Sequence, residues 1–157
     1  MGGMRNLQHG LTLLEVLISI AVIAILASIS IGSYGGWIKN MQLESTATQI
    51  ISDLRGAQAN AFGGQGGLNW GIHFVNNGDT EYYEIFSTPT DYSDSSKTIT
   101  GTVYLQKDIV FSDPPVGNPK NVVFNRATGT INSNTQIVVI LGNKTKTINI
   151  TTVGSIY

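Results

Sequence analysis

The sequence predicts an α+β protein, in which a long N-terminal helix packs on a β-rich head that forms an antiparallel sheet or a small β-sandwich. Two observations support this fold class. Apolar residues run almost without interruption from residue 11 and then recur at helical spacings up to residue 61. Beyond residue 67, apolar and polar residues alternate in short segments separated by turn-forming sequences. We therefore divide the chain into residues 1–10, an apolar helical segment at 11–36, an amphipathic half of the helix at 37–62, and a head at 63–157.

Composition and charge exclude several kinds of function. The 157 residues include nine Lys and Arg and ten Asp and Glu, and the formal net charge of −1 provides no overall basic field for nucleic acid. The absence of cysteine excludes disulfide bonds and thiolate metal sites. Ser, Thr, Asn and Gly are abundant from residue 87 onward, a composition common on extracellular β-rich proteins.

The apolar run from Leu11 to Ile31 is long enough to cross a bilayer as a helix. Its residues would span roughly 30 Å, the thickness of the hydrocarbon core. Glu15 is the only charged residue in this run. An acid at the centre of a membrane helix costs about 2.5 to 3.5 kcal/mol, and less near the helix end. Because of this cost, we expect Glu15 to have a specific role.

Three interpretations of the run differ in how they treat Glu15. In a signal anchor, its carboxylate would sit near the lipid headgroups. A secretory signal peptide could be cut near the small residues Ser28 and Ser30, but the acid and the length of the apolar run argue against this. Cleavage between Gly10 and Leu11 would instead create an α-amino group one helical turn from Glu15. If a neighbouring chain supplied that amine, Glu15 would align one helix beside another.

The sequence "G|LTLLEVLISIAVIAILA" resembles the class III signal of type IV pilins and type II secretion pseudopilins. These signals have a short hydrophilic leader, a glycine before the cut, and an apolar stretch with glutamate at its fifth position. The resemblance implies a leader at residues 1–10, cleavage by prepilin peptidase between Gly10 and Leu11, and N-methylation of Leu11. It also implies that Glu15 makes the salt bridge that guides assembly. Leu11 departs from the commonest pattern, which has phenylalanine at this position.

The same resemblance implies a cellular setting. Residues 11–36 would be a single transmembrane helix in the inner membrane and, after assembly, part of the filament core. The head would be exported to the periplasm or the cell exterior, and the product would be a surface filament or a pseudopilus. The implied partners are other pilin or pseudopilin subunits, prepilin peptidase, the inner-membrane assembly platform, and membrane lipid before assembly.

The second half of the helix is predicted to be amphipathic. In residues 37–62, a stripe of apolar side chains recurs at spacings of three and four, namely Leu43, Ala47, Ile50, Ile51, Leu54, Ala57 and Ala61. Gly32, Gly35 and Gly36 lie at the junction of the two halves, and each glycine costs about 1 kcal/mol of helix propensity. We expect a hinge there that melts on filament packing. The sequence "FGGQGG" is expected to end the helix.

The head is predicted to consist of short antiparallel strands. "NNGD" is expected to be the turn of a hairpin formed by residues 70–75 and "EYYEIFS". Further strands are expected at residues 99–105, 108–112, 121–125, 136–141 and 146–151. The order of these features, including "LRGAQANA", "VVFNRATGTI" and the closing "VGSIY", is similar to that of the GspH/FimT-type minor pseudopilins.

Few residues are candidates for catalysis. His9 and His73 are the only histidines, so we expect neither a histidine metal cluster nor a nucleophile–base pair. We therefore predict no catalytic residues, no metal and no cofactor. A membrane-tethered enzyme is the interpretation that the sequence supports least, because the chain presents no constellation of catalytic side chains.

The acidic residues of the head are interpreted as solvated. Asp79, Glu81 and Glu84 flank the first hairpin, where we expect an exposed edge. Asp91 and Asp94 lie in "TDYSDSSK", which falls short of a full set of calcium ligands.

The predicted function is that of a structural subunit, a minor pilin or pseudopilin that acts by assembly and not as an enzyme. The alternative is a DNA-binding minor pilin for natural transformation, which would use Lys144 and Lys146 in or beside the turn "LGNKTK". Lys120 and Arg126 lie on another connection. Nucleic-acid binding needs several converging cations, so a solvated turn is the preferred interpretation.

Overall fold

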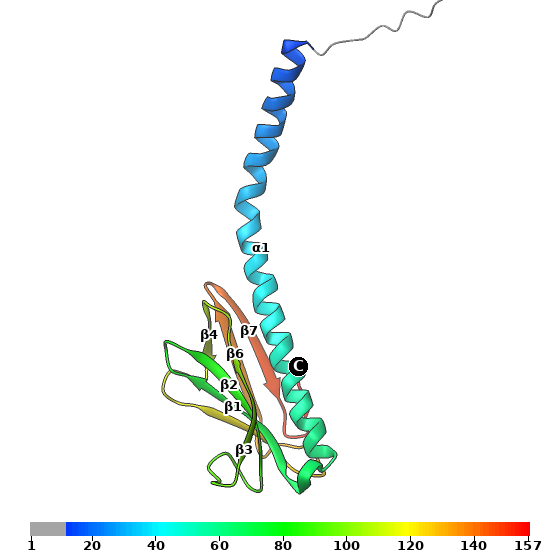
Figure 1. Cartoon of the computed structure of the whole chain (residues 1–157), viewed down its shortest axis with the longest axis vertical. Helices are drawn as coiled ribbons and strands as arrows, with labels where there is room; N and C mark the ends of the chain where they lie inside the picture. The colour runs from blue at the N-terminus through cyan, green and yellow to red at the C-terminus, as the bar shows by residue number, and fades with distance from the viewer. Residues whose placement is uncertain (1–11) are drawn as a thin grey trace, which may run out of the picture. The chain divides into compact units, whose positions relative to one another are not determined.

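The computed structural model describes residues 12–157, and the side chains in that range except those of residues 29–34 (Figure 1). The chain divides into two compact units, Met1–Ile38 and Lys39–Tyr157. The predicted α+β class is confirmed, because a long N-terminal helix is followed by antiparallel sheets.

The helix α1 extends over Leu13–Phe62. At its start, the Thr12 hydroxyl accepts the backbone N–H of Glu15 at 3.2 Å, which satisfies one donor of the first turn. At its end, Gly64 takes the left-handed conformation with φ of 63°. The Gly64 N–H donates to the Ala61 carbonyl at 3.0 Å, so the predicted glycine stop is confirmed.

The predicted apolar stripe of α1 faces the core of the head. Ile51 is half-buried, whereas the other six stripe residues are at most 5 % exposed: Leu43, Ala47, Ile50, Leu54, Ala57 and Ala61. The spacing of apolar residues therefore predicted correctly which face of this half of the helix is buried.

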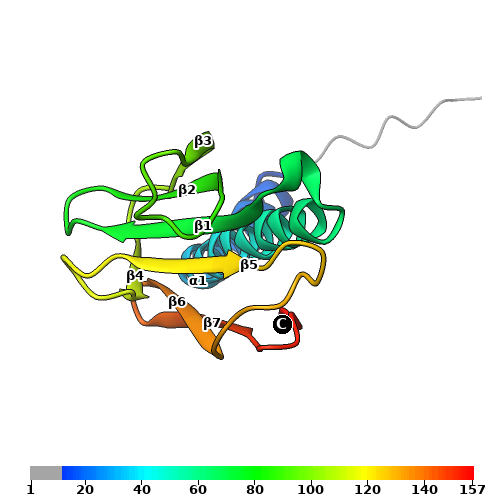
Figure 2. The same ribbon diagram turned by 90° about the horizontal axis from the view of Figure 1, so that it is seen from below.

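In the described part of the chain, seven antiparallel strands form two sheets, after a short 3₁₀ helix η1 at Gln65–Gly67. The four-stranded sheet has the order β3-β2-β1-β5 and contains β1 (Asn69–Asn76), β2 (Glu81–Thr88), β3 (Thr98–Tyr104) and β5 (Lys120–Phe124). The three-stranded sheet has the order β4-β6-β7 and contains β4 (Ile109–Asp113), β6 (Thr135–Leu141) and β7 (Lys144–Ile150). All seven predicted strands are present, with small differences at their ends. Figures 1 and 2 show both sheets beside the C-terminal half of α1.

One hydrophobic core joins α1 to both sheets. Its largest members include Phe74, Tyr83, Phe124 and Ile137, which are at most 1 % exposed. Burying an apolar side chain of this size stabilises a fold by about 1.5 to 3 kcal/mol. All the residues of this core lie between residues 43 and 156. The unit Lys39–Tyr157 therefore contains its own core, and we expect it to fold without residues 1–38.

The C-terminal residues close the edge of β7. Asn149 and Tyr157 exchange two backbone hydrogen bonds, of 2.8 and 3.1 Å. Arg55 of α1 donates to the Ile156 carbonyl at 3.0 Å, and Gln58 donates to the Gly154 carbonyl at 2.8 Å. The last residues thus link the three-stranded sheet to the helix.

Candidate functional site

The first part of α1 presents apolar side chains on all its faces. We call residues 13–28 the apolar segment. Its large apolar side chains, from Leu13 to Leu26, are between 43 and 83 % exposed. A helix that is apolar all round is stable only when other helices or lipid cover it. The apolar segment is therefore an interaction surface.

Glu15 lies in the first turn of this segment and is exposed. It is the only charged residue between positions 12 and 38. Its carbonyl accepts the Ser19 hydroxyl at 2.7 Å, and the partial positive charge at a helix N-terminus favours an acid at this position. Both ion pairs identified among the described residues lie elsewhere, so the Glu15 carboxylate is available for a cation from outside this part of the chain.

The predicted processing site, Gly10 and Leu11, lies outside the described residues, so cleavage and N-methylation stay predictions. The predicted membrane helix at 11–36 is described only in part. Among the residues that the structure covers, no helix is both long enough and apolar enough to span a membrane.

The three glycines of the predicted hinge lie within α1, which is helical through Gly32, Gly35 and Gly36. A Cβ atom at Gly35 or Gly36 would meet nothing within 4 Å. Packing of the described residues therefore does not require glycine at these two positions. Melting on filament assembly stays a prediction.

Three of the four basic residues considered for the DNA-binding alternative have partners among the described residues. Lys146 of β7 pairs with Glu44 of α1, and Lys120 pairs with Asp113. The Arg126 guanidinium donates to the Gly67 carbonyl at 2.7 Å. Lys144 lies at the turn between β6 and β7. DNA contacts by Lys144 and Lys146 stay a prediction, and the ion pair of Lys146 reduces the positive charge that it offers.

Glu81 corrects the expectation of a solvated acidic edge. Its side chain is only 8 % exposed, and its carboxylate accepts the Phe111 backbone N–H at 3.4 Å. Burial raises the pKa of this carboxyl, and the hydrogen bond from Phe111 opposes the rise. The alternation in "EYYEIFS" contained the signal, because it places Glu81 on the same face as the buried Tyr83.

A second group of side chains, which the sequence did not indicate, lies on the four-stranded sheet. The rings of His73 and Tyr92 stack with centroids 3.6 Å apart, and His73 Nδ1 lies 2.5 Å from Asn121 Oδ1. The Tyr92 hydroxyl donates to Glu84 at 2.5 Å. Burial, followed by the interactions with Glu84, raises the pKa of Tyr92 well above its usual value. These contacts hold the connection between β2 and β3 against the sheet.

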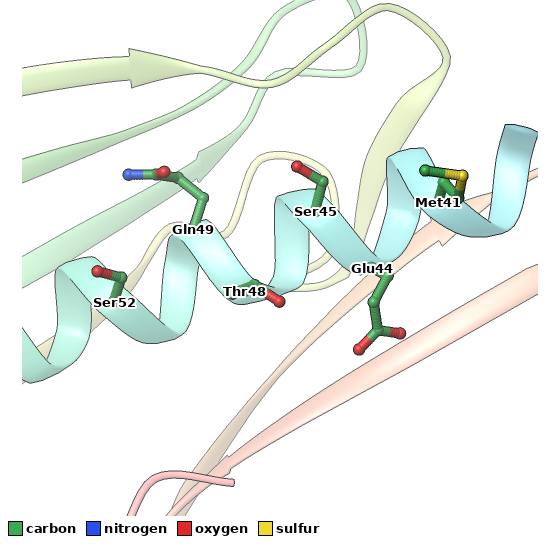
Figure 3. Close-up of a pocket in the computed structure, with 6 residues that line it drawn as sticks. All are labelled: Met41, Glu44, Ser45, Thr48, Gln49 and Ser52. Carbon is green, nitrogen blue, oxygen red and sulfur yellow. The ribbon is translucent and has the colours of Figure 1, made fainter.

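A shallow pocket on the exposed face of α1 has no features of a catalytic site. Its lining residues all come from one helix: Met41, Glu44, Ser45, Thr48, Gln49 and Ser52. Figure 3 shows Glu44 and Gln49 pointing in different directions. Its only acid, Glu44, is paired with Lys146. In the described residues, no three His, Asp or Glu side chains are grouped so that they could hold a metal ion.

The comparisons with known proteins bear on the N-terminus. Residues 5–31 match the model of the prokaryotic N-terminal methylation motif. No curated protein and no solved structure matches the chain. The similarity of the head to GspH/FimT-type pseudopilins therefore stays a prediction. The chain thus carries the N-terminal methylation motif of pilin-like proteins, and it joins that motif to a pilin-like arrangement of a long helix and antiparallel sheets.

Proposed function

We propose that this chain is a structural subunit of a type IV pilus or a type II secretion pseudopilus, which prepilin peptidase processes and which assembles through its N-terminal helix. The observation that carries the proposal is the apolar segment, which is exposed on all faces and contains a single acid, Glu15. This segment lies within the residues that match the methylation motif.

The apolar segment explains why the subunit would not stay as an isolated chain in water. Each large apolar side chain gains about 1.5 to 3 kcal/mol when it is fully buried, and the segment carries a series of them. Before assembly, lipid of the inner membrane would cover these side chains. In the filament, the helices of neighbouring subunits would replace the lipid.

Glu15 would make this exchange selective. Cleavage after Gly10 would free the α-amine of Leu11, which is then methylated and keeps its positive charge. An acid in an apolar environment is strongly destabilised unless it is paired, so the Glu15 of an incoming subunit would be driven toward the amine of a neighbour. The subunit would therefore act by assembly, without a catalytic step of its own.

The test replaces Glu15 by leucine in the full chain, with Glu44→Leu as the matched control. Glu44 is also an exposed acid on α1, but it lies outside the apolar segment. We expect Glu15→Leu to remain in the membrane fraction with a folded head, and to lose incorporation into filaments by at least about tenfold. Glu44→Leu should assemble normally.

Mass spectrometry of the mature N-terminus accompanies this test. It should find a methylated Leu11 in the wild type. Filaments that contain Glu15→Leu at the wild-type level would contradict the proposed role of the carboxylate, and a mature chain that keeps residues 1–10 would contradict the processing.

A further inference from the structure

A basic pocket lies in the head where α1 meets two loops, and we call it the neck pocket. Its volume is about 470 Å³. Its lining includes Lys39 and Gln42 of α1, Gln106, Lys107 and Asp108 of the connection between β3 and β4, and Gly142 of the turn between β6 and β7. We propose that the neck pocket binds the phosphate of an anionic phospholipid headgroup. This inference rests on the proposed function, because a helix anchored in the inner membrane would bring Lys39 near lipid headgroups.

The polar groups of the neck pocket suit a phosphate. The lining includes two lysines, Lys39 and Lys107, and one acid, Asp108, so the formal charge of the lining residues is positive. Gln42 and Gln106 add carboxamide N–H donors. Ammonium and amide N–H groups are the donors that phosphate oxygens accept, and hydrogen bonds to the charged groups are the strongest of these.

Gly142 keeps the neck pocket open beside Lys39. It turns the chain between β6 and β7 with φ of +62°. A Cβ atom at this position would lie 4.0 Å from Lys39 Nζ, so a larger side chain would occupy the space next to the ammonium group. A glycine here satisfies the turn and also leaves room for a ligand.

Lys144 lies in the strand register beside the neck pocket, although it is not one of the lining residues. Lys146 contacts Glu44 of α1, and side chains two positions apart on a strand point to the same face. Lys144 therefore faces α1 as well. In the register of the hairpin, Lys144 pairs with Leu141, which also lines the neck pocket. Unlike Lys146, Lys144 has no ion pair among the described residues.

The position of the neck pocket along the chain favours a lipid over DNA. Lys39 comes two residues after the exposed Trp37 and three after the end of the proposed membrane segment at residue 36. Tryptophan and lysine are enriched where a helix leaves a bilayer, at the depth of the headgroup phosphates. The two lysines of the neck pocket can pair with one headgroup phosphate, whereas duplex DNA requires cations along a longer surface.

The test uses the fragment 37–157 with an acetylated N-terminus, because this part of the chain contains the whole core. Its binding is measured by co-sedimentation with vesicles of phosphatidylcholine alone, and with vesicles that contain about 30 mol % phosphatidylglycerol. The neck variant is Lys39→Gln with Lys107→Gln. The control, Lys97→Gln with Arg126→Gln, removes the same charge from other parts of the head.

We expect binding only to the anionic vesicles. The neck variant should bind at least about tenfold more weakly, and the control should keep most of the affinity.

Equal losses in the two variants would overturn the proposal, because they would indicate a general charge effect. The absence of vesicle binding would also overturn it, as would neck-dependent binding of duplex DNA in place of vesicles at about 150 mM salt. The fragment lacks Glu15, so failure of the assembly test would leave this result unaffected.

Discussion

Gly71, in the middle of β1, allows the backbone of β5 and the ring of Phe86 in β2 to lie close to β1. A Cβ atom here would lie 2.5 Å from the Val122 carbonyl oxygen of β5 and 2.8 Å from the ring of Phe86 in β2. Both distances are shorter than a carbon atom can make without displacing its neighbours. Glycine loses more conformational entropy on folding than other residues do, but it leaves the space that this packing requires.

We predict that Gly71→Ala destabilises the head by about 1 to 3 kcal/mol, since backbone and an aromatic ring must both shift. The control is Gly101→Ala in β3, where a Cβ atom would meet only Ile85 Cδ1, at 4.0 Å. Urea unfolding followed by circular dichroism should show a lower midpoint for Gly71→Ala alone. Equal midpoints for the two variants would show that the sheet can relax around the added methyl group.

Glu81 gives the stability of the head a dependence on pH. Its folded pKa is raised above the ordinary value of 4.5, because burial disfavours the charged form. Above the folded pKa the native state holds a charge that the unfolded state solvates better. The contribution of Glu81 to the free energy of unfolding is therefore lowest at neutral pH. It rises as the pH falls from the folded pKa toward 4.5.

We predict that Glu81→Gln, which keeps an oxygen for the Phe111 N–H, stabilises the head at pH 7 by up to about 1 kcal/mol. This gain should shrink as the pH falls toward the ordinary carboxyl range. Glu84→Gln is the control on the same strand. Denaturation curves across this range measure the change in the free energy of unfolding. A gain in stability that is independent of pH would show that the titration of Glu81 is not its cause.

At the scale of elements, α1 combines two halves with different surroundings. Residues 13–28 are exposed and apolar, whereas from Leu43 to Ala61 one face is buried in the head. Between them, Gly35 and Gly36 remain helical without a packing reason for glycine. Their effect must then be on the stability of the helix itself, because glycine lowers helix propensity by about 1 kcal/mol relative to alanine.

We predict that Gly35→Ala with Gly36→Ala stabilises α1 locally, folds normally and reduces filament incorporation, because the junction could no longer melt. The control is Gly56→Ala, which also adds a methyl group to α1 without contacts within 4 Å. Amide exchange of residues 31–37, compared between membrane-resident and assembled wild type, tests the melting directly. Equal protection in both states would contradict a hinge.

At the scale of the whole molecule, the core belongs to one unit and the interaction surface to the other. Residues 43–156 supply every member of the core, and the exposed apolar segment lies before residue 38.

We predict that the fragment 37–157 is folded and unfolds cooperatively in urea without detergent. The full chain should need detergent or lipid to remain in solution. A fragment that unfolds without cooperativity would show that the first unit contributes to the fold of the head.

The sequence by itself determined the elements and the N-terminal signal. The buried stripe of α1, the glycine stop at Gly64 and the seven strands follow from local periodicity and turn chemistry, which a short window of sequence contains. Glu15 stands out because one charge interrupts an apolar run. These features are local, so they could be predicted without knowledge of the rest of the chain.

Only the tertiary structure decided how the elements meet. It divided the strands into two sheets, stacked Tyr92 on His73, and brought Lys39, Lys107 and Gly142 to one pocket. These residues are far apart in the sequence, and their meeting depends on which strand edges pair. Edge pairing uses backbone groups that all residues share, so the local sequence does not specify it.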